Sequence, residues 1–412
     1  MIRHIKNVAH LVQAFIANVI FRFPSSKMIC IGVTGTDGKT TTASLIYTIL
    51  RKANKKTCLI TTVGAYIGDT MHDTGFHVTT PSAFSLQAYL KKAKDAGCTH
   101  AVIEVTSHAL DQNRTFGIHF KIGVLSNITH EHLDYHKTYD RYVQAKSHLL
   151  LASDICVINR EDVSYEKLSA ILKGTKCISY GVSHSLADYT CESFQFETPL
   201  LGVFNQQNIL ASIVATKNLG ISDNDIHNAI ASYNPPIGRQ EVIYKNDYTV
   251  IVDFAHTPHS FKQILPVVKS LSSNRLIHVF GTASERDETK RPFMGEESAK
   301  YADIIILTAE DPRKESVFEI NKSILKGIPK MFERIDPEKY VCGSKNIVIQ
   351  FARREEAITF AIKIAEKGDV IIATGKGHEQ SMNYGNGEEP YDEKRILLNA
   401  INIRDTNYGK TS

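Results

Sequence analysis

A glycine- and threonine-rich segment has the residue types and the spacing of a phosphate-binding loop. It lies between an apolar run and an amphipathic stretch and reads Gly32-Val33-Thr34-Gly35-Thr36-Asp37-Gly38-Lys39-Thr40-Thr41-Thr42. Such a turn lets backbone N–H groups close around phosphate oxygens at a helix N-terminus, where the helix dipole also favours an anion. Lys39 is expected to reach the β- and γ-phosphates of a nucleotide, and the Thr40 hydroxyl to hold Mg²⁺. The segment departs from the general pattern G-x-x-x-x-G-K-T at Val33, and a plain structural turn is the alternative.

Two further segments carry side chains that could bind a metal beside this loop. Glu104 lies near the end of the apolar run Ala101–Val105, at the strand edge where open α/β sheets bind ligands. Its carboxylate suits Mg²⁺, and the alternative is a solvated acid at a strand end. His130, His132 and His136 follow the next apolar run, and their spacing first suggests zinc. The neighbouring phosphate loop favours Mg²⁺ or Mn²⁺ instead.

Short apolar runs alternate with amphipathic stretches around these residues. The runs predict strands over 28–33, 101–105, 123–126 and 155–158, and the amphipathic stretches predict helices over 41–53, 82–96, 139–152 and 205–219. This alternation is typical of a mainly parallel, doubly wound α/β sheet. Lys146 falls on the third of these helices, where residue type alone favours an ordinary exposed lysine.

A second domain is predicted after the segment Tyr233–Gly238, which contains two prolines and a glycine. Strand-like runs then resume at 249–252, 276–280, 304–307 and 370–373. We expect an N-terminal amphipathic helix over 1–27, a first domain over 28–235 and a second over 236–412, each large enough to bury its own core.

The N-terminal segment shows apolar residues at helical spacing. They are Ile5, Val8, Val12, Phe15, Ile16 and Val19, and polar residues interrupt them, so no apolar run long enough to span a membrane exists. The segment also lacks a signal-peptide cleavage site. We expect this helix to pack its apolar side against the protein body, with attachment to a membrane surface as the alternative.

The composition is that of a soluble globular protein. The chain has 412 residues, of which 42% are hydrophobic and 22% charged, and its net charge is +4. This balance gives no support for a nucleic-acid partner. The seven cysteines form no C-x-x-C pair, which indicates reduced thiols in a cytoplasmic protein rather than a disulfide scaffold or a zinc ribbon.

The loop variant G-T-D-G-K-T-T-T resembles that of the Mur ligases, the ATP-dependent amide-forming enzymes of peptidoglycan precursor synthesis. Further strings occur in the family's order, and together they are most similar to its tripeptide-forming MurE branch. They are T-T-P at 79–81, E-V-T-S-H-A-L at 104–110, N-I-T-H-E-H-L-D-Y-H at 127–136, A-K at 145–146, F-N-x-x-N at 204–208, G-R at 238–239, V-D-F-A-H-T-P at 252–258, E-R-D-x-x-K-R-P at 285–292, E-D-P-R at 310–313 and G-K-G-H-E at 375–379. The resemblance implies a central P-loop-type ATPase domain followed by a Rossmann-like C-terminal ligase domain.

The resemblance also implies a role for individual residues. It assigns catalysis to Lys39, Glu104, His132 and Lys146, and it assigns two Mg²⁺ ions to Thr40, Glu104, His132 and a carbamylated Lys146. It assigns ATP to Gly35, Thr36, Asp37, Gly38, Lys39, Thr40, Thr41, Asn205, Asn208, Arg239, Asp253 and His256, and so to residues from both domains. The muramoyl-peptide nucleotide is assigned to Thr79, Thr80, Thr106, Gln112 and Arg114, and the free amino acid to Arg286, Glu310, Asp311, Pro312, Arg313, Gly375 and Glu379. Carbamylation requires a neutral amine, and therefore a partly buried Lys146 with a lowered pKa.

The implied reaction joins an amino acid to the D-glutamyl carboxylate of a UDP-N-acetylmuramoyl dipeptide through an acyl phosphate. Arg313 favours meso-diaminopimelate over lysine, because it can pair with a distal carboxylate. Two departures stand out: only 27 residues precede Met28, where the branch has a uridine-binding domain, and E-D-P-R replaces D-N-P-R. Alternatives are a lysine-adding, folylpolyglutamate-type or cyanophycin-type ligase, and a non-catalytic nucleotide-binding subunit. We expect a cytoplasmic monomer without a membrane span.

Overall fold

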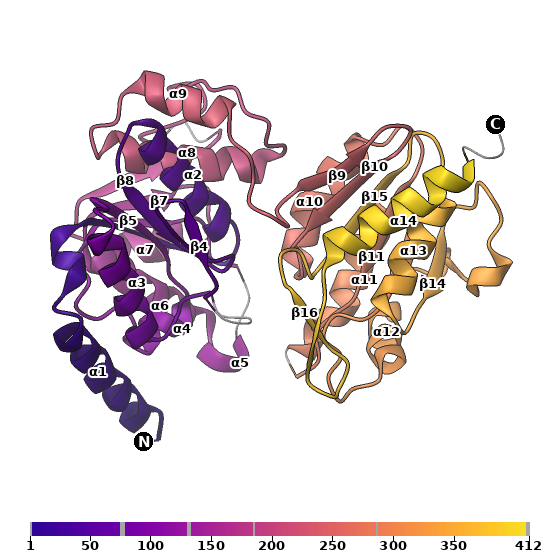
Figure 1. Cartoon of the computed structure of the whole chain (residues 1–412), viewed down its shortest axis with the longest axis horizontal. Helices are drawn as coiled ribbons and strands as arrows, with labels where there is room; N and C mark the ends of the chain where they lie inside the picture. Colours follow the sequence, from indigo (N-terminus) through magenta and orange to yellow (C-terminus); the bar gives the residue numbers. More distant parts are fainter. Residues whose placement is uncertain (1, 75–78, 130–132, 184–185, 286, 409–412) are drawn as a thin grey trace. The chain divides into compact units, whose positions relative to one another are not determined.

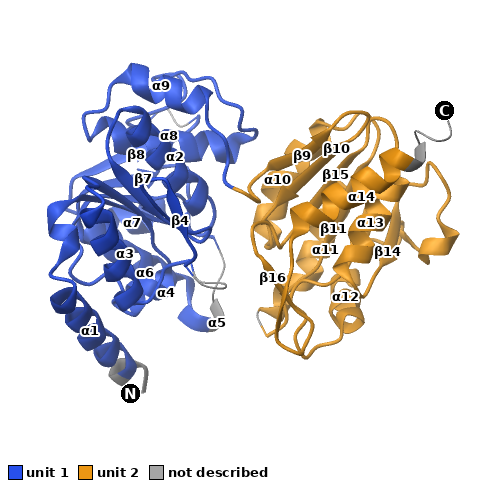
Figure 2. Cartoon of the chain, in the orientation of Figure 1, with its two compact units in different colours: residues 1–236 blue, residues 237–412 orange. Residues whose placement is uncertain are grey.

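Two compact units make up the chain, Met1–Pro236 and Ile237–Ser412 (Figure 2). The computed structural model describes residues 2–74, 79–129, 133–183, 186–285 and 287–408. The N-terminal helix belongs to unit 1, and the units meet in sequence within the Pro-rich segment Tyr233–Gly238. Each unit is built on a mainly parallel sheet, so the predicted α/β class is confirmed.

The first strand in the sequence lies at the centre of the unit 1 sheet. Its strands are β1 (Ile29–Thr34), β2 (Thr57–Ile60), β3 (Ala65–Ile67), β4 (Thr70–His72), β5 (His100–Glu104), β6 (Phe120–Leu125), β7 (Ser153–Asn159) and β8 (Cys177–Tyr180). In the described residues their order is β4-β3-β2-β5-β1-β6-β7-β8. β1 pairs in parallel with both β5 and β6, so the segments that follow these three strands emerge at one edge of the sheet.

Helices cover both faces of this sheet (Figure 1). They are α1 (Ile2–Ile20), α2 (Lys39–Lys52), α3 (Ala83–Asp95), α4 (Ser107–Asp111), α5 (Leu133–His136), α6 (Tyr139–Leu151), α7 (Tyr165–Ile171), α8 (Val203–Lys217) and α9 (Asp223–Ala231), with the 3₁₀ turn η1 (Pro24–Lys27). Alternate residues of β1 face opposite sides: Ile31 packs with α2, α8 and α9, whereas Cys30 packs with α3. Burial on both faces explains why the central strands are continuous apolar runs.

Unit 2 repeats the layered arrangement. Its strands are β9 (Glu241–Lys245), β10 (Thr249–Asp253), β11 (Leu276–Phe280), β12 (Ile304–Leu307), β13 (Glu333–Arg334), β14 (Ile347–Gln350), β15 (Val370–Thr374), β16 (Ser381–Asn383) and β17 (Glu388–Pro390). Its helices are α10 (Pro258–Ser270), α11 (Arg291–Ala299), α12 (Val317–Leu325), α13 (Arg354–Ile364) and α14 (Glu393–Tyr408), with the 3₁₀ turns η2 (Glu288–Lys290) and η3 (Pro337–Lys339). The main sheet of the described part has the order β13-β14-β12-β11-β15-β10-β9. α13 and α14 pack on one face, and Phe261 of α10 packs on the other.

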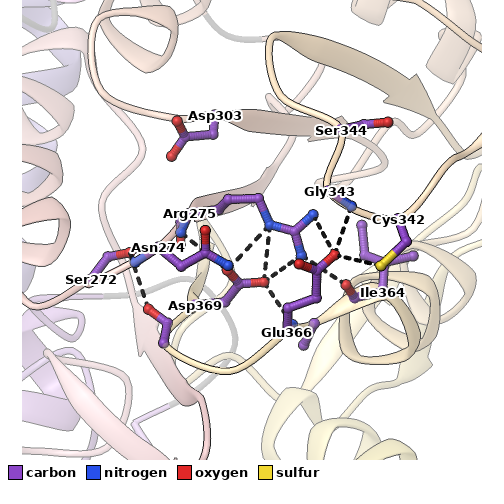
Figure 3. Close-up of polar contacts among 12 residues, drawn as sticks. Ser272, Asn274, Arg275, Asp303, Cys342, Gly343, Ser344, Ile364, Glu366 and Asp369 are labelled. Carbon is purple, nitrogen blue, oxygen red and sulfur yellow. Dashed lines mark hydrogen bonds and ion pairs between the residues drawn. The ribbon is translucent and has the colours of Figure 1, made fainter.

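A buried ion cluster fixes the amino edge of the second sheet (Figure 3). Arg275 precedes β11 and is fully buried, and its guanidinium lies 2.6 Å from Asp369, which precedes β15, and 3.0 Å from Glu366. The Gly343 N–H also donates to Glu366 at 2.8 Å. This cluster joins the starts of two neighbouring strands. Four sequence motifs of unit 2 follow the opposite, carboxyl ends of β10, β11, β12 and β15, and the G-R motif precedes β9.

The structure corrects the expected packing of the N-terminal helix. The apolar stripe that was expected to face the protein body faces outward, and the side chains of Val8, Val12 and Phe15 are about half exposed. α1 instead packs through Ala14 and Ala17, beside Ala83 of α3. Among the described residues, none of the helices has the length and apolarity needed to cross a bilayer.

Candidate functional site

The loop between β1 and α2 has two glycines that no other residue could replace without a steric clash. Gly38 has a left-handed φ of 78°, and a β-carbon there would lie 2.2 Å from Asn208 Oδ1. A β-carbon at Gly35 would lie 1.9 Å from Ser126 Oγ. The predicted strand–loop–helix context is confirmed, because α2 begins at Lys39, directly after Gly38.

The segment that follows β6 holds this loop in place. The Asp37 N–H donates to Asn127 Oδ1 at 2.8 Å, and Ser126 Oγ donates to the Asp37 carbonyl at 2.6 Å. Lys39 Nζ donates to the Thr36 carbonyl at 2.7 Å, so the ammonium lies over its own loop. Residue type did not single out Ser126 or Asn127 as loop supports, although Ser126 ends a predicted strand and Asn127 follows it directly.

Glu104 is buried at the end of β5 and connects two loops. It accepts hydrogen bonds from Thr40 Oγ1 at 3.0 Å, from the Thr62 N–H at 3.2 Å and from Thr62 Oγ1 at 3.3 Å. The alternative of a solvated strand-end acid is therefore wrong. The donors to Glu104 among the described residues are hydroxyl and backbone N–H groups, and the carboxylate and the Thr40 hydroxyl together offer the hard oxygen atoms that Mg²⁺ prefers. The family's Mg²⁺ therefore fits this chemistry.

Lys146 contacts the same loop from α6, the helix that lies between β6 and β7 in the sequence. Glu104 contacts it from β5, which pairs with the other edge of β1. Its side chain on α6 is about 1% exposed, its Nζ donates to the Gly35 carbonyl at 2.6 Å, and the Nζ lies 4.6 Å from the centre of the Tyr142 ring. The expectation from residue type alone, an exposed helical lysine, is wrong. Burial disfavours a charged amine, whereas the Gly35 carbonyl and the Tyr142 ring both stabilise one, so the carbamylation of Lys146 stays a prediction.

The histidines of the Asn127–His136 segment have different outcomes. His136 is buried and its Nε2 lies 3.0 Å from Ser107 Oγ, so its ring takes part in a hydrogen bond within unit 1. His130 and His132 lie outside the described residues, so the assignment of His132 to a metal stays a prediction.

Four of the five residues assigned to the muramoyl peptide form one cluster at the carboxyl edge of the first sheet. Thr106 caps α4, and Thr80 Oγ1 accepts its N–H at 2.9 Å. Arg114 Nη1 donates to the Thr80 carbonyl at 2.7 Å, while its Nε and Nη2 both donate to Gln112 Oε1. The amide oxygen of Gln112 therefore occupies the fork in which a substrate carboxylate could bind. Thr79 lies next to Thr80, half-buried.

The two asparagines assigned to ATP support the phosphate loop from α8. Asn208 Oδ1 accepts the Thr42 hydroxyl at 3.2 Å, and its Nδ2 donates to Asn205 Oδ1 at 3.2 Å. Both asparagines are buried, and Asn208 contacts Gly38 directly. The two asparagine side chains therefore lie between α8 and the phosphate loop.

The unit 2 residues assigned to ATP gather around Phe254. The Arg239 guanidinium lies 4.4 Å from the Phe254 ring centre, and Asp253 accepts the Gln240 and Ala255 N–H groups, each at 2.8 Å. Desolvation lowers the pKa of His256 to about 3, and the Lys290 charge acts in the same direction. His256 is therefore neutral at physiological pH.

The E-D-P-R and G-K-G-H-E strings meet around a lysine that sequence reasoning missed. Lys376 is fully buried, and its Nζ lies 3.0 Å from Asp311 and 2.6 Å from Glu379. Among the described residues, Asp311 also accepts the Asn383 N–H at 2.9 Å. The signal available in the sequence was the position of Lys376, which has a glycine on each side and the acid Glu379 three residues later.

Arg313 itself is partly exposed beyond Pro312. Its Nη1 lies 3.3 Å from Glu285 Oε2, and its backbone has a left-handed φ of 49°. Arginine has no intrinsic preference for that conformation, so the loop imposes it. Arg286 lies outside the described residues, and its assignment stays a prediction.

Glu310 is buried with one oxygen unsatisfied. Within the described residues its Oε2 has no hydrogen-bond partner, and a β-carbon at Gly375 would lie 2.3 Å from that atom. Gly375 has a φ of 101°, so both its conformation and the close approach of Glu310 require glycine. Burial raises the pKa of Glu310 to about 8. Burial therefore favours the protonated form of Glu310 at neutral pH.

This raised pKa makes stability depend on pH. The folded state keeps the Glu310 proton between about pH 4.5 and pH 8, whereas the unfolded chain loses it near 4.5. The stability that Glu310 contributes is thus complete below that window and is lost as pH rises through it. We expect the unfolding temperature of Glu310→Gln to exceed that of the native protein by a margin that grows from pH 4.5 to pH 8.

The matched control is Glu356→Gln, at an exposed position of α13 in the same unit. Its unfolding curve should follow the native one at every pH. Parallel curves for native protein and Glu310→Gln, measured by thermal melts across this pH range, would contradict the raised pKa.

Two protein-family descriptions match most of the chain. The Mur ligase middle domain matches residues 33–216, and the Mur ligase, glutamate ligase domain matches residues 238–377. The chain is 36% identical over 417 residues to the UDP-N-acetylmuramoyl-L-alanyl-D-glutamate–2,6-diaminopimelate ligase of Trichormus variabilis, covering 95% of this chain and 81% of that protein. It is 35% identical to the ligase of the same name from Aquifex aeolicus, covering 93% and 80%. A solved structure of a ligase with that name superposes with a TM-score of 0.62 at 29% identity, covering 92% and 79%.

Proposed function

Because the chain belongs to the Mur ligase family, we propose that it is an ATP-dependent ligase that joins 2,6-diaminopimelate to the D-glutamyl carboxylate of UDP-N-acetylmuramoyl-L-alanyl-D-glutamate. The observation that carries this proposal is the convergence of Lys39, Glu104 and Lys146 on one glycine-rich loop. Each is held by the loop itself or by a residue of its first helical turn. This arrangement supports phosphoryl transfer, and the relatives' names give the acceptor and the amine.

The reaction begins at the phosphate loop. The D-glutamyl carboxylate attacks the γ-phosphorus of ATP, so an acyl phosphate forms and ADP leaves. Lys39 neutralises charge on the transferring group, and the loop N–H groups orient it. Mg²⁺ would be held by Thr40 and Glu104, with His132 and the carbamate of Lys146 as the further ligands that the resemblance implies, and it would supply further neutralisation. Arg114 and Gln112 position the muramoyl peptide.

The amino acid then replaces the phosphate. Its neutral amine attacks the acyl carbon, a tetrahedral intermediate forms, and phosphate leaves. We assign the distal carboxylate of diaminopimelate to Arg313 and its distal ammonium to Glu310. Glu310 suits an ammonium better than Glu379 does, because Glu379 already pairs with Lys376 while Glu310 Oε2 is buried and unsatisfied in the described structure.

The test of the function is phosphate release from ATP and Mg²⁺ with the muramoyl dipeptide nucleotide and one amino acid at a time. Release should require both the dipeptide and diaminopimelate, and mass spectrometry should find the tripeptide. Release with a pteroyl-glutamate acceptor in place of the dipeptide would instead support the folylpolyglutamate alternative. ATP binding without turnover on any acceptor would support a non-catalytic subunit.

The choice of amino acid depends on Arg313. We expect Arg313→Ala to lower kcat/KM for diaminopimelate by about 30-fold or more, since losing one partner of a desolvated charge pair costs about 2–5 kcal/mol. The kcat/KM for lysine, which has no distal carboxylate, should change little. Initial rates with both amino acids at equal concentration give the comparison.

Lys314→Ala is the matched control, because this neighbouring side chain is exposed. It should leave both rates unchanged. A native preference for lysine, or an unchanged preference in Arg313→Ala, would refute the assignment of Arg313 without refuting ligase activity.

A further inference from the structure

α1 has the reverse of the usual arrangement of polar and apolar side chains on a surface helix. The side chains that face the protein are small or polar: Ala14 and Ala17 are fully buried, and Asn18 donates to the Phe116 carbonyl at 2.7 Å. Asn7, on the same side, lies 3.5 Å from Asp111. A surface helix normally turns such residues toward solvent and buries its bulky apolar ones.

The bulky apolar side chains of α1 form an exposed face. We call it the α1 apolar face; its members are Val8, Leu11, Val12, Phe15, Ile16, Val19 and Ile20. Phe15 is 53% exposed and Ile20 is 58% exposed. Phe23 extends the exposed apolar surface beyond the helix end, and Figure 1 shows the amino-terminal part of α1 extending past the other elements of unit 1. A contiguous apolar surface of this kind marks a contact site.

The charged side chains that α1 and the turn after it contribute have one sign, and the acidic Asp111 contacts the opposite, protein-facing side of the helix. Lys6, Arg22 and Lys27 are exposed, Arg3 also precedes them in the sequence, and the first acidic residue of the chain is Asp37. A second copy of α1 would bring these like charges together, which disfavours self-association. An anionic surface complements them. Apolar side chains flanked by Lys and Arg are the composition of helices that lie in a membrane interface.

We propose that α1 lies in the surface of a membrane that contains anionic phospholipids, with the α1 apolar face inserted between headgroups and with Lys6, Arg22 and Lys27 against the phosphates. The helix would lie in the plane of the membrane and would not cross it. This proposal does not depend on the ligase reaction, because none of its residues belongs to the phosphate loop or to the substrate clusters.

Flotation of the full-length protein with lipid vesicles tests the proposal. We expect binding to vesicles rich in phosphatidylglycerol, much weaker binding to phosphatidylcholine vesicles, and loss of binding at high salt. The double substitution Phe15→Asp and Ile16→Asp should weaken binding by about tenfold or more, because it removes two apolar insertions. Lys6→Glu with Arg22→Glu should weaken binding to the anionic vesicles and abolish their advantage over neutral ones.

Val163→Asp is the matched control: this valine is 76% exposed and lies outside α1 in the same unit. It should bind vesicles as the native protein does. Equal binding to anionic and neutral vesicles, or unchanged binding by both α1 variants, would overturn the proposal. So would a lipid-free dimer that Phe15→Asp with Ile16→Asp dissociates, because a second copy would then cover the face. If the apolar variant misfolds, the charge variant still tests the proposal, because its substituted side chains are exposed. A thermal melt of the charge variant checks that it is folded.

Discussion

Replacing Lys39 with alanine is expected to lower amino-acid-dependent ATP hydrolysis by about 10³-fold. Lys39 is the cation of the phosphate loop, and phosphoryl transfer depends mainly on positioned charges that neutralise the transferring group. The native contact of Lys39 Nζ, with the Thr36 carbonyl at 2.7 Å, is local, so its loss should leave the fold unchanged. Phosphate release at saturating substrates and a thermal melt measure the two effects.

Lys52→Ala provides the control for this experiment. Lys52 ends the same helix and is exposed, so its loss tests the effect of removing a positive charge from α2 in general. It should leave turnover near the native rate. If Lys39→Ala turns over at the native rate, the interpretation of residues 32–42 as a phosphate loop is wrong.

Replacing Lys146 with alanine is expected to lower turnover by about 10²-fold or more, with partial recovery when a short carboxylate such as acetate is added. A carbamate would make Lys146 an anion beside the loop, and added carboxylate could take its place in the cavity that alanine leaves. Loss of the bond from Nζ to the Gly35 carbonyl also costs stability, by about 1–3 kcal/mol. Recovery with carboxylate is therefore the measurement that separates a carbamate from a purely structural lysine.

Two variants sharpen this test. Lys146→Arg keeps a cation near Gly35 but cannot form the carbamate, so it should be as inactive as Lys146→Ala. Gln144→Ala, at an exposed position of the same helix, should be fully active. An active Lys146→Arg, or a Lys146→Ala that no carboxylate restores, would leave Lys146 with a structural role only.

The sequence predicted the central elements because their signals are local. The buried run before Gly35 and the lysine–threonine start of α2 predict a strand, a loop and a helix that the structure confirms. The short strands β2, β3, β4 and β8 were missed, since runs of three or four residues next to turns carry little periodicity. Helical periodicity also identified the apolar face of α1, but it could not tell which way that face points.

The site residues that the sequence misjudged are those whose environment comes from distant segments. Lys146 is buried because its amine contacts Gly35, which lies 111 positions earlier in the chain. The burial of Lys376 could not be predicted in the same way, because its partner Asp311 lies 65 positions away in the sequence. Residue type favours exposure for lysine, and only long-range pairing overrides that preference.

The position of β15 has a consequence for synthesis on the ribosome. In unit 1 the central strand, β1, is made first, and β5, which joins β2 to β1, is complete at residue 104, before half of that unit has been made. In unit 2 the central strand comes late: β15 pairs in parallel with both β10 and β11. Until residues 370–374 emerge, the nascent second sheet consists of two separate pieces with unpaired apolar edges. Such edges invite aggregation, so unit 2 is the part of the nascent chain that depends most on chaperones or on rapid completion.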